Sequence, residues 1–136
     1  MNCVISATHV IMINGESTKF FKSGRGLRQD YPLSPLLFIL VMEGLGLTLK
    51  EGQANGKLTG INVSRLIKIL HLLFVDDVLI MTKALIEEWK EIEKILCVFC
   101  GASVLMINLQ KSTFHHFWVK QEILEALKEI YHYNFI

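Results

Sequence analysis

Residues 74–80 read Phe74-Val75-Asp76-Asp77-Val78-Leu79-Ile80 and place two adjacent carboxylates inside an apolar, strand-forming segment. Burying a carboxylate without a partner costs several kcal/mol, or the group takes up a proton instead. A tight turn between two strands avoids this cost, because both acids stay in water while the flanking strands are buried. We therefore expect a β-hairpin formed by residues 66–74 and 78–81, with Asp76 and Asp77 at its tip.

The acidic pair at this tip has two interpretations on these residues alone. Carboxylate oxygens are the ligands that a hard divalent cation such as Mg²⁺ prefers, so Asp76 and Asp77 are candidate metal ligands. Aspartate is also a common turn residue, because its side chain bonds to the nearby backbone and tolerates unusual dihedral angles. The hairpin motif by itself does not separate a metal site from an ordinary turn.

The composition favours one folded domain over the whole chain, residues 1–136. Apolar residues make up 51% and charged residues 20%, which excludes a disordered polypeptide. The net charge of +1 indicates neither a nucleic-acid nor a membrane partner. The longest uninterrupted apolar run, Leu36–Met42, is far shorter than the roughly 20 residues that cross a bilayer. Three cysteines cannot form a complete disulfide framework, which favours a reducing compartment.

Two elements are expected before the acidic hairpin. Residues 9–13 and 18–22 alternate as strands around Asn14-Gly15-Glu16-Ser17, and Asn-Gly is a strong hairpin signal. Residues 36–51 then predict a helix, with Ser34 as N-cap, Pro35 at the first helical position and Gly52 as terminator. Because its first two turns are apolar on every side, we expect this helix to be buried.

Three elements are expected after the hairpin. Residues 85–100 have apolar side chains at helical spacing and predict an amphipathic helix. Its solvent face is expected to contain Glu87, Glu88, Lys90, Glu91 and Lys94. A short strand at residues 105–109 and a last helix from Val119 to about Tyr133 complete the chain. Antiparallel strands with helices on one face form an α+β fold.

Two further motifs accompany the acidic pair. Upstream, the chain reads Gly24-Arg25-Gly26-Leu27-Arg28-Gln29-Asp30-Tyr31-Pro32-Leu33-Ser34-Pro35, and downstream it reads Asn108-Leu109-Gln110-Lys111-Ser112. Together with Phe74–Asp77 they resemble the palm of reverse transcriptases, specifically those of plant non-LTR (LINE-type) retrotransposons. That family's pattern reads Arg-Gly-Leu-Arg-Gln-Gly-Asp-Pro-Leu-Ser-Pro, then Phe-Ala-Asp-Asp, then Asn-x-x-Lys-Ser. The resemblance covers about residues 10–118.

The resemblance implies an RNA-directed DNA polymerase with a partial right-hand palm, in which antiparallel β-hairpins pack on helices. Such enzymes transfer nucleotides onto a primer 3′-hydroxyl by a two-metal mechanism with Mg²⁺. Their partners are an RNA template, a DNA primer and deoxynucleotide triphosphates. By the same resemblance, Asp76 and Asp77 are the catalytic metal ligands, with Asp76 the firmer one. Arg28, Gln29 and Lys111 would lie near the incoming nucleotide and template.

The sequence departs from the family pattern in ways that argue against activity. Asp30 stands where the family has glycine, which adds a Cβ and a negative charge close to the expected triphosphate. Tyr31 replaces an acid with a bulky ring. The first metal-binding aspartate of the family lies on an upstream strand, yet Glu16 is the only carboxylate in residues 1–22. We therefore expect a palm fragment without that strand, fingers or thumb, and without catalytic competence.

A basic stretch precedes the loop motif. Lys19, Lys22 and Arg25, followed by Arg28, have no acid between them, so they are candidate contacts to nucleic-acid phosphates. Lysines that protect a solvated strand edge are an equally good interpretation. Lys111 is likewise either a site residue, as the resemblance implies, or an ordinary surface lysine.

The remaining candidates favour structural roles. The spacing of Cys97 and Cys100 resembles half of a zinc site, with His115-His116 downstream. However, adjacent histidines do not match the usual spacing of zinc ligands. We expect both cysteines in the core, and Trp89 and Trp118 in the core or at an interface.

The sequence is compatible with three functional hypotheses. The first is a reverse transcriptase fragment that is inactive in isolation. The second is a non-enzymatic, degenerate palm with weak nucleic-acid affinity. The third is a relic that has no stable fold.

Overall fold

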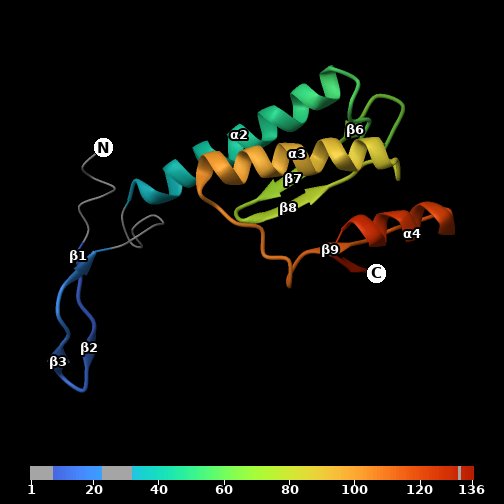
Figure 1. The fold of residues 1–136 in the computed structure, drawn as a ribbon. Coiled ribbons are helices and arrows are strands. Elements are labelled where there is room, and N and C mark those ends of the chain that lie inside the picture. Colours follow the sequence, from blue (N-terminus) through green and yellow to red (C-terminus); the bar gives the residue numbers. More distant parts are fainter. Residues whose placement is uncertain (1–7, 23–31, 132) are drawn as a thin grey trace. The chain divides into compact units, whose positions relative to one another are not determined.

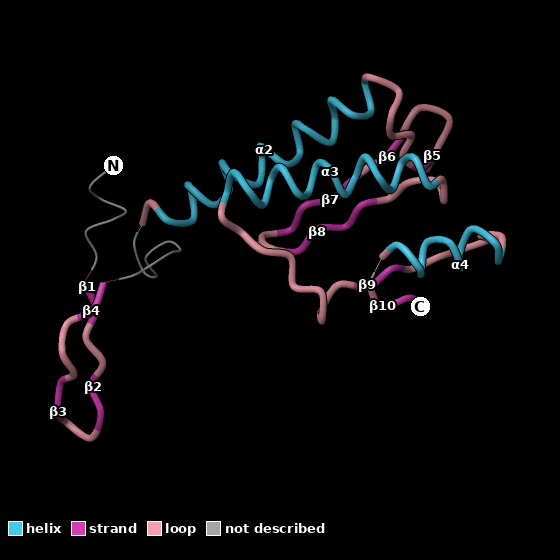
Figure 2. Tube along the Cα trace, in the orientation of Figure 1, coloured by secondary structure: helices cyan, strands magenta, loops and turns pink. Residues whose placement is uncertain are grey.

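The computed structural model describes residues 8–22, 32–131 and 133–136, and its ribbon and trace are drawn in Figures 1 and 2. Its elements are β1 (Thr8–His9), β2 (Met12–Ile13), β3 (Glu16–Ser17), β4 (Phe21–Lys22), α2 (Ser34–Ala54), β5 (Ile61–Asn62), β6 (Lys68–Ile69), β7 (His71–Phe74), β8 (Asp77–Ile80), α3 (Ile86–Ser103), β9 (Thr113–Phe114), α4 (Gln121–Ile130) and β10 (Asn134–Phe135). The chain divides into two compact units, Met1–Ile39 and Leu40–Ile136. Of the helices in the described segments, none combines the length and apolar character needed to cross a membrane.

The expected N-terminal hairpin is confirmed. β1 pairs with β4 and β2 pairs with β3, both antiparallel. Because Ile13 lies opposite Glu16, β2 and β3 are joined by a two-residue turn. Asn14 and Gly15 have φ angles of 51° and 86°, the positive values that a type I′ turn requires at both central positions. The Asn-Gly signal therefore located this turn correctly.

The helix predicted at residues 36–51 is present as α2, but Gly52 lies inside it and does not terminate it. A Cβ at Gly52 would lie 3.0 Å from Leu58 Cδ1 and 3.4 Å from Ile95 Cδ1, so the glycine admits both side chains at close range. The helix ends three residues later than predicted, at Ala54. The chain turns at Gly56, whose φ is 72°.

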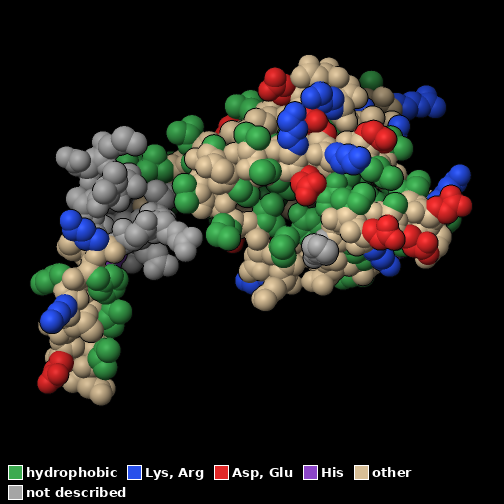
Figure 3. Space-filling view, in the orientation of Figure 1, with side chains coloured by type: hydrophobic (Ala, Val, Ile, Leu, Met, Phe, Trp, Pro, Cys, Tyr) green, Lys and Arg blue, Asp and Glu red, His purple; other side chains and the backbone are tan. Residues whose placement is uncertain are grey.

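The expectation that the first turns of this helix are buried was wrong. Leu36, Ile39 and Leu40 are exposed, and Leu40 retains 69% of its accessible surface. Burial begins further along, at Met42, Leu45 and Leu49, which form one buried stripe of the helix within the second unit. Figure 3 shows hydrophobic side chains on the visible surface of the molecule.

The acidic hairpin is also confirmed, as β7 and β8 with Phe74 opposite Asp77. The long first strand predicted at residues 66–74 is divided, because β6 pairs with β5 while β7 pairs with β8. Helices α2 and α3 run antiparallel beside this hairpin in Figure 1. A Cβ at Gly46 of α2 would lie 3.3 Å from His71 Nε2, so the glycine lets β7 approach the helix closely. Burial and the charge of Lys50 lower the pKa of His71, which favours its neutral form.

Helix α3 confirms the predicted amphipathic helix, but one residue that was predicted on its solvent face is buried. Glu88, expected in solvent, is only 4% exposed. Its carboxylate accepts hydrogen bonds from Thr59 N at 3.2 Å and Thr59 Oγ1 at 2.8 Å, and also from Thr82 Oγ1. The buried acid therefore joins α3 to the segments that precede β5 and follow β8. Charged residues are buried in this way only when donors satisfy them.

A cluster of aromatic side chains forms the core of the C-terminal part. The members of this cluster are Phe114, Leu127 and Tyr131, with Ile86, Trp89, Ile123, Tyr133 and Phe135 packed against them. Trp89 and Phe114 have ring centroids 4.5 Å apart, which attaches β9 to α3. The predicted last helix is confirmed as α4, and its Leu124 and Leu127 point into the core.

The strand predicted at residues 105–109 is not formed. A strand requires a partner, and the chain provides one slightly later, where Thr113–Phe114 of β9 pairs in parallel with Asn134–Phe135 of β10. Apart from this pair, the strands of the described segments pair antiparallel, and helices make up the rest of the regular structure. The α+β class expected from sequence is confirmed.

Candidate functional site: an acidic hairpin tip

The two aspartates are positioned by a two-residue turn. Val75 and Asp76 connect the strands, and Asp77 begins β8 opposite Phe74. Val75 has a φ of 53°, in the left-handed region that a β-branched residue seldom adopts. Such strain costs of order 1–3 kcal/mol, and it is typically found where the surrounding structure imposes it.

Both carboxylates are exposed to solvent. Among the side-chain hydrogen bonds and ion pairs of the described residues, none involves the carboxylate of Asp76 or Asp77. Two neighbouring negative charges therefore face water without a cationic partner among residues 8–22, 32–131 and 133–136. Oxygen ligands of this kind attract a hard divalent cation, which neutralises both charges at once.

The outer face of the hairpin is apolar around the aspartates. Directly opposed residues of an antiparallel pair lie on the same face, so Asp77 shares its face with Phe74, Leu72 and Leu79. All four residues are exposed, and Phe74 retains 76% of its surface. The other face, with His71 and Leu73, lies toward α2. The acids thus border an open apolar surface on a sheet that helices support from behind.

The donor set fits a divalent cation only in part. Two carboxylates with water in the remaining positions match the coordination that Mg²⁺ prefers. Within the described ranges, no group of three or more His, Cys, Asp or Glu residues is arranged to hold a metal. Asp76 and Asp77 would therefore bind a cation weakly by themselves.

The Asn108–Ser112 motif forms a compact turn whose asparagine has a structural role. Asn108 Oδ1 accepts hydrogen bonds from the backbone of Gln110 at 3.1 Å and Lys111 at 3.3 Å. Ser112 Oγ donates to the Asn108 carbonyl at 2.9 Å. The Asn and Ser of the motif are thus turn residues, while Lys111 is exposed. Since no contact of Lys111 with Asp76 or Asp77 is found in the described part of the chain, its role near a nucleotide stays a prediction.

The other candidate binding residues divide into two groups. Lys19 and Lys22 are exposed on the N-terminal hairpin, and their contact with phosphates stays a prediction. Arg25, Arg28 and Gln29 lie outside the described residues, as do the departures Asp30 and Tyr31.

The core assignment of the cysteines was wrong for Cys97. Cys97 is exposed and Cys100 is half-buried, and both are free thiols. They form no metal cluster with His115 or His116 in the segments that the structure describes.

The two tryptophans differ from each other. Trp89 packs in the aromatic cluster, as expected. Trp118 is fully exposed, so it is not a core residue, and an interface role for it stays a prediction.

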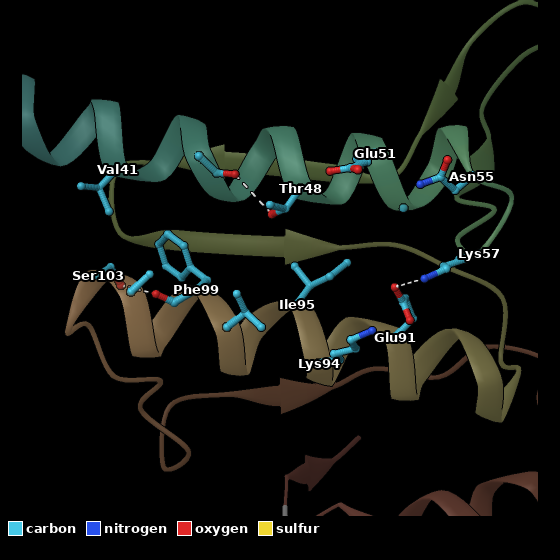
Figure 4. A pocket seen from close by; sticks show the side chains of 14 residues that line it. Val41, Thr48, Glu51, Asn55, Lys57, Glu91, Lys94, Ile95, Phe99 and Ser103 are labelled. Carbon is cyan, nitrogen blue, oxygen red and sulfur yellow. Dashed lines mark hydrogen bonds and ion pairs between the residues drawn. The ribbon is translucent and has the colours of Figure 1, made fainter.

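A groove separates α2 from α3, with a volume of about 500 Å³. Val41, Ile95 and Phe99 line its apolar part, and the 2.9 Å ion pair between Lys57 and Glu91 lies at its other end (Figure 4). Hydrogen bonding to Lys57 lowers the pKa of Glu91. Of the predicted site residues that the structure describes, none lines this groove.

Comparison with known proteins agrees with the motifs at the hairpin. The family described as "Reverse transcriptase (RNA-dependent DNA polymerase)" matches residues 2–131. This chain belongs to the reverse transcriptase family. Reverse transcriptases use divalent metal ions and bind template and primer nucleic acids, which is consistent with paired acids at the tip of a supported hairpin.

An uncharacterized mitochondrial protein of Arabidopsis thaliana is 46% identical to this reverse transcriptase fragment over 69 residues. The alignment covers 50% of this chain and 57% of the relative. The chain thus spans little more than half the length of the curated relative that it matches, and that relative is a plant protein.

Proposed function

We propose that this chain is part of the palm of a LINE-type retrotransposon reverse transcriptase, and that Asp76 and Asp77 hold its divalent cation. The observation behind this proposal is the exposed hairpin tip, where two carboxylates have no counter-ion within the described segments. The ordered occurrence of the loop, hairpin and Asn-x-x-Lys-Ser motifs supports the LINE-type assignment. The family match supports the broader polymerase class.

The contribution of the chain itself is to hold and orient charge. Asp76 and Asp77 would hold Mg²⁺, which would supply positive charge to offset the charge that develops on a transferred phosphoryl group. The backbone of β7 and β8 fixes the two aspartates side by side, and helix α2 supports the hairpin at Gly46. The apolar surface formed by Leu72, Phe74 and Leu79 borders the acids on one side.

The isolated chain is expected not to polymerise nucleotides. Two carboxylates bind a cation weakly, and nucleotidyl transfer depends strongly on positioning both substrates together. Asp30 and Tyr31 further alter the loop that would meet the triphosphate. Purified chain, a primed RNA template, deoxynucleotides and Mg²⁺ are expected to give no extended primer.

The control for this assay is an active reverse transcriptase acting on the same template, which shows that the template can be copied. Synthesis that depends on Mg²⁺ and disappears in the Asp76→Ala variant would show that the chain is an enzyme by itself. That result would contradict the proposed inactivity while supporting the metal site.

A second candidate function is favoured by the N-terminal hairpin, where Lys19 and Lys22 are both exposed. The chain would then bind nucleic acid without catalysis. In a fluorescence anisotropy titration, the logarithm of affinity should fall linearly with the logarithm of salt concentration, because bound phosphates release counterions. An affinity independent of salt, or no binding at about 50 mM salt, would exclude this function.

A further inference from the structure

The N-terminal hairpin exposes an aromatic side chain that the metal site does not use. Phe20, between β3 and β4, retains 77% of its accessible surface. Its neighbour Phe21 is 46% exposed and packs against His9, with ring centroids 5.8 Å apart and planes tilted by 33°. Phe20 forms no ring pair with any of the described residues. Figure 3 shows hydrophobic and basic side chains together on this hairpin.

A β-bulge lies at Phe20 in the second half of the hairpin. Between the pairs His9↔Phe21 and Met12↔Ser17, the first strand has two residues and the second has three. Thr18 N donates to Ile11 O at 2.9 Å, which leaves Lys19 and Phe20 together opposite Val10. A bulge of this kind disrupts the ladder and redirects a side chain. Phe20 therefore lies in the bulge, outside the regular pairing, with its large ring exposed to solvent.

The charges around Phe20 select one class of partner. Lys19 and Lys22 lie on either side of the two phenylalanines and are exposed. The one acid of the described hairpin, Glu16, lies beside the Asn14-Gly15 turn at its other end. An exposed ring between two cations complements a ligand that has planar faces and a regularly charged backbone. A single-stranded nucleic acid has both features, since its unpaired bases stack on aromatic rings while its phosphates contact lysines.

We propose that Phe20 is a stacking platform for an unpaired base of a single-stranded nucleic acid, with Lys19 and Lys22 contacting the adjacent phosphates. The proposal rests on the second candidate function above and identifies its site. It does not depend on the aspartates, because the platform belongs to the N-terminal unit while Asp76 and Asp77 belong to the other.

The test compares the full chain on two oligomers of equal length and charge, an oligothymidylate and an abasic strand. Stacking is available only to the first. We expect the wild-type chain to bind oligothymidylate about tenfold more tightly, the size of effect known for one stacked base. Phe20→Ala should abolish that preference without changing the salt dependence, and Phe20→Trp should retain it. Lys19→Gln with Lys22→Gln should weaken both oligomers equally and reduce the salt slope by about 1.4.

The matched control is Phe117→Ala, which removes a ring of similar exposure, 79%, from the other unit. It should leave both affinities unchanged. Equal binding of the two oligomers by the wild type, or a Phe20→Ala variant with undiminished preference, would overturn the stacking proposal. So would the absence of binding to either oligomer, which would also remove the second candidate function. The metal site would be unaffected by these outcomes, because it is measured by cation binding at Asp76 and Asp77.

Discussion

Replacing Glu88 with alanine is expected to lower the free energy of unfolding by about 3 kcal/mol. The substitution removes the acceptor of three hydrogen bonds, from Thr59 N, Thr59 Oγ1 and Thr82 Oγ1. A buried donor without an acceptor costs about 1–3 kcal/mol, and bonds to a charged group are the stronger ones. Because a domain of this size is stable by only about 5–15 kcal/mol, the loss is a large fraction of the total. The measurement is urea denaturation followed by circular dichroism.

Glu87→Ala is the matched control, since it removes a neighbouring carboxylate that is exposed. It should change stability by less than about 0.5 kcal/mol. Glu88→Gln keeps an acceptor and should fall between the two. If the Glu88→Ala and Glu87→Ala variants had the same free energy of unfolding, the buried, hydrogen-bonded placement of the Glu88 side chain would be contradicted. A cooperative transition in the wild type also decides against the relic without a stable fold.

Local signals predicted the elements of this fold well. Asn14-Gly15 predicted the turn of the N-terminal hairpin, and the two acids within an apolar segment predicted the turn of the acidic hairpin. Both signals depend only on a few neighbouring residues. The amphipathic spacing of α3 and α4 identified both helices. The tip of the acidic hairpin, which is the centre of the candidate site, was therefore predictable from sequence.

Features that depend on distant partners were not predictable in this way. Gly52 has the signature of a helix terminator, yet Leu58 and Ile95 lie against it and the helix continues. Glu88 belongs to a charged face by periodicity, and only Thr59 and Thr82 make its burial possible. The strand expected at residues 105–109 formed instead at β9, where β10 pairs with it. In each case, a contact between segments far apart in sequence overrode the local pattern.

The left-handed conformation of Val75 is another feature that sequence did not indicate. Valine is disfavoured at positive φ, so no local rule predicts it there. The register explains this conformation, because Phe74 opposite Asp77 leaves only two residues for the turn, whereas the sequence predicted three between the strands. Two-residue turns that match the twist of the strands require positive φ at the first central position.

The double substitution Asp76→Asn and Asp77→Asn is expected to weaken divalent-cation binding about 100-fold. One unit charge at 4 Å contributes about 1 kcal/mol in water, so a divalent cation between two carboxylates gains up to about 4 kcal/mol before salt screens part of it. Asparagine keeps the size and the turn-forming tendency of aspartate, which leaves the hairpin intact. We expect Asp76→Asn alone to have a larger effect than Asp77→Asn alone. Isothermal titration with Mn²⁺ measures these affinities, and Glu87→Gln is the matched control.

The most direct test of the metal-binding hairpin is a map of Mn²⁺ by paramagnetic broadening of the backbone amide resonances. The account predicts that the amides of residues 74–78 broaden first in the wild-type chain. It further predicts that this broadening disappears in the double asparagine variant and persists in Glu87→Gln. Broadening centred elsewhere, for example on Glu51 and Glu91 in the α2–α3 groove, or broadening unchanged by the double substitution, would contradict the central claim.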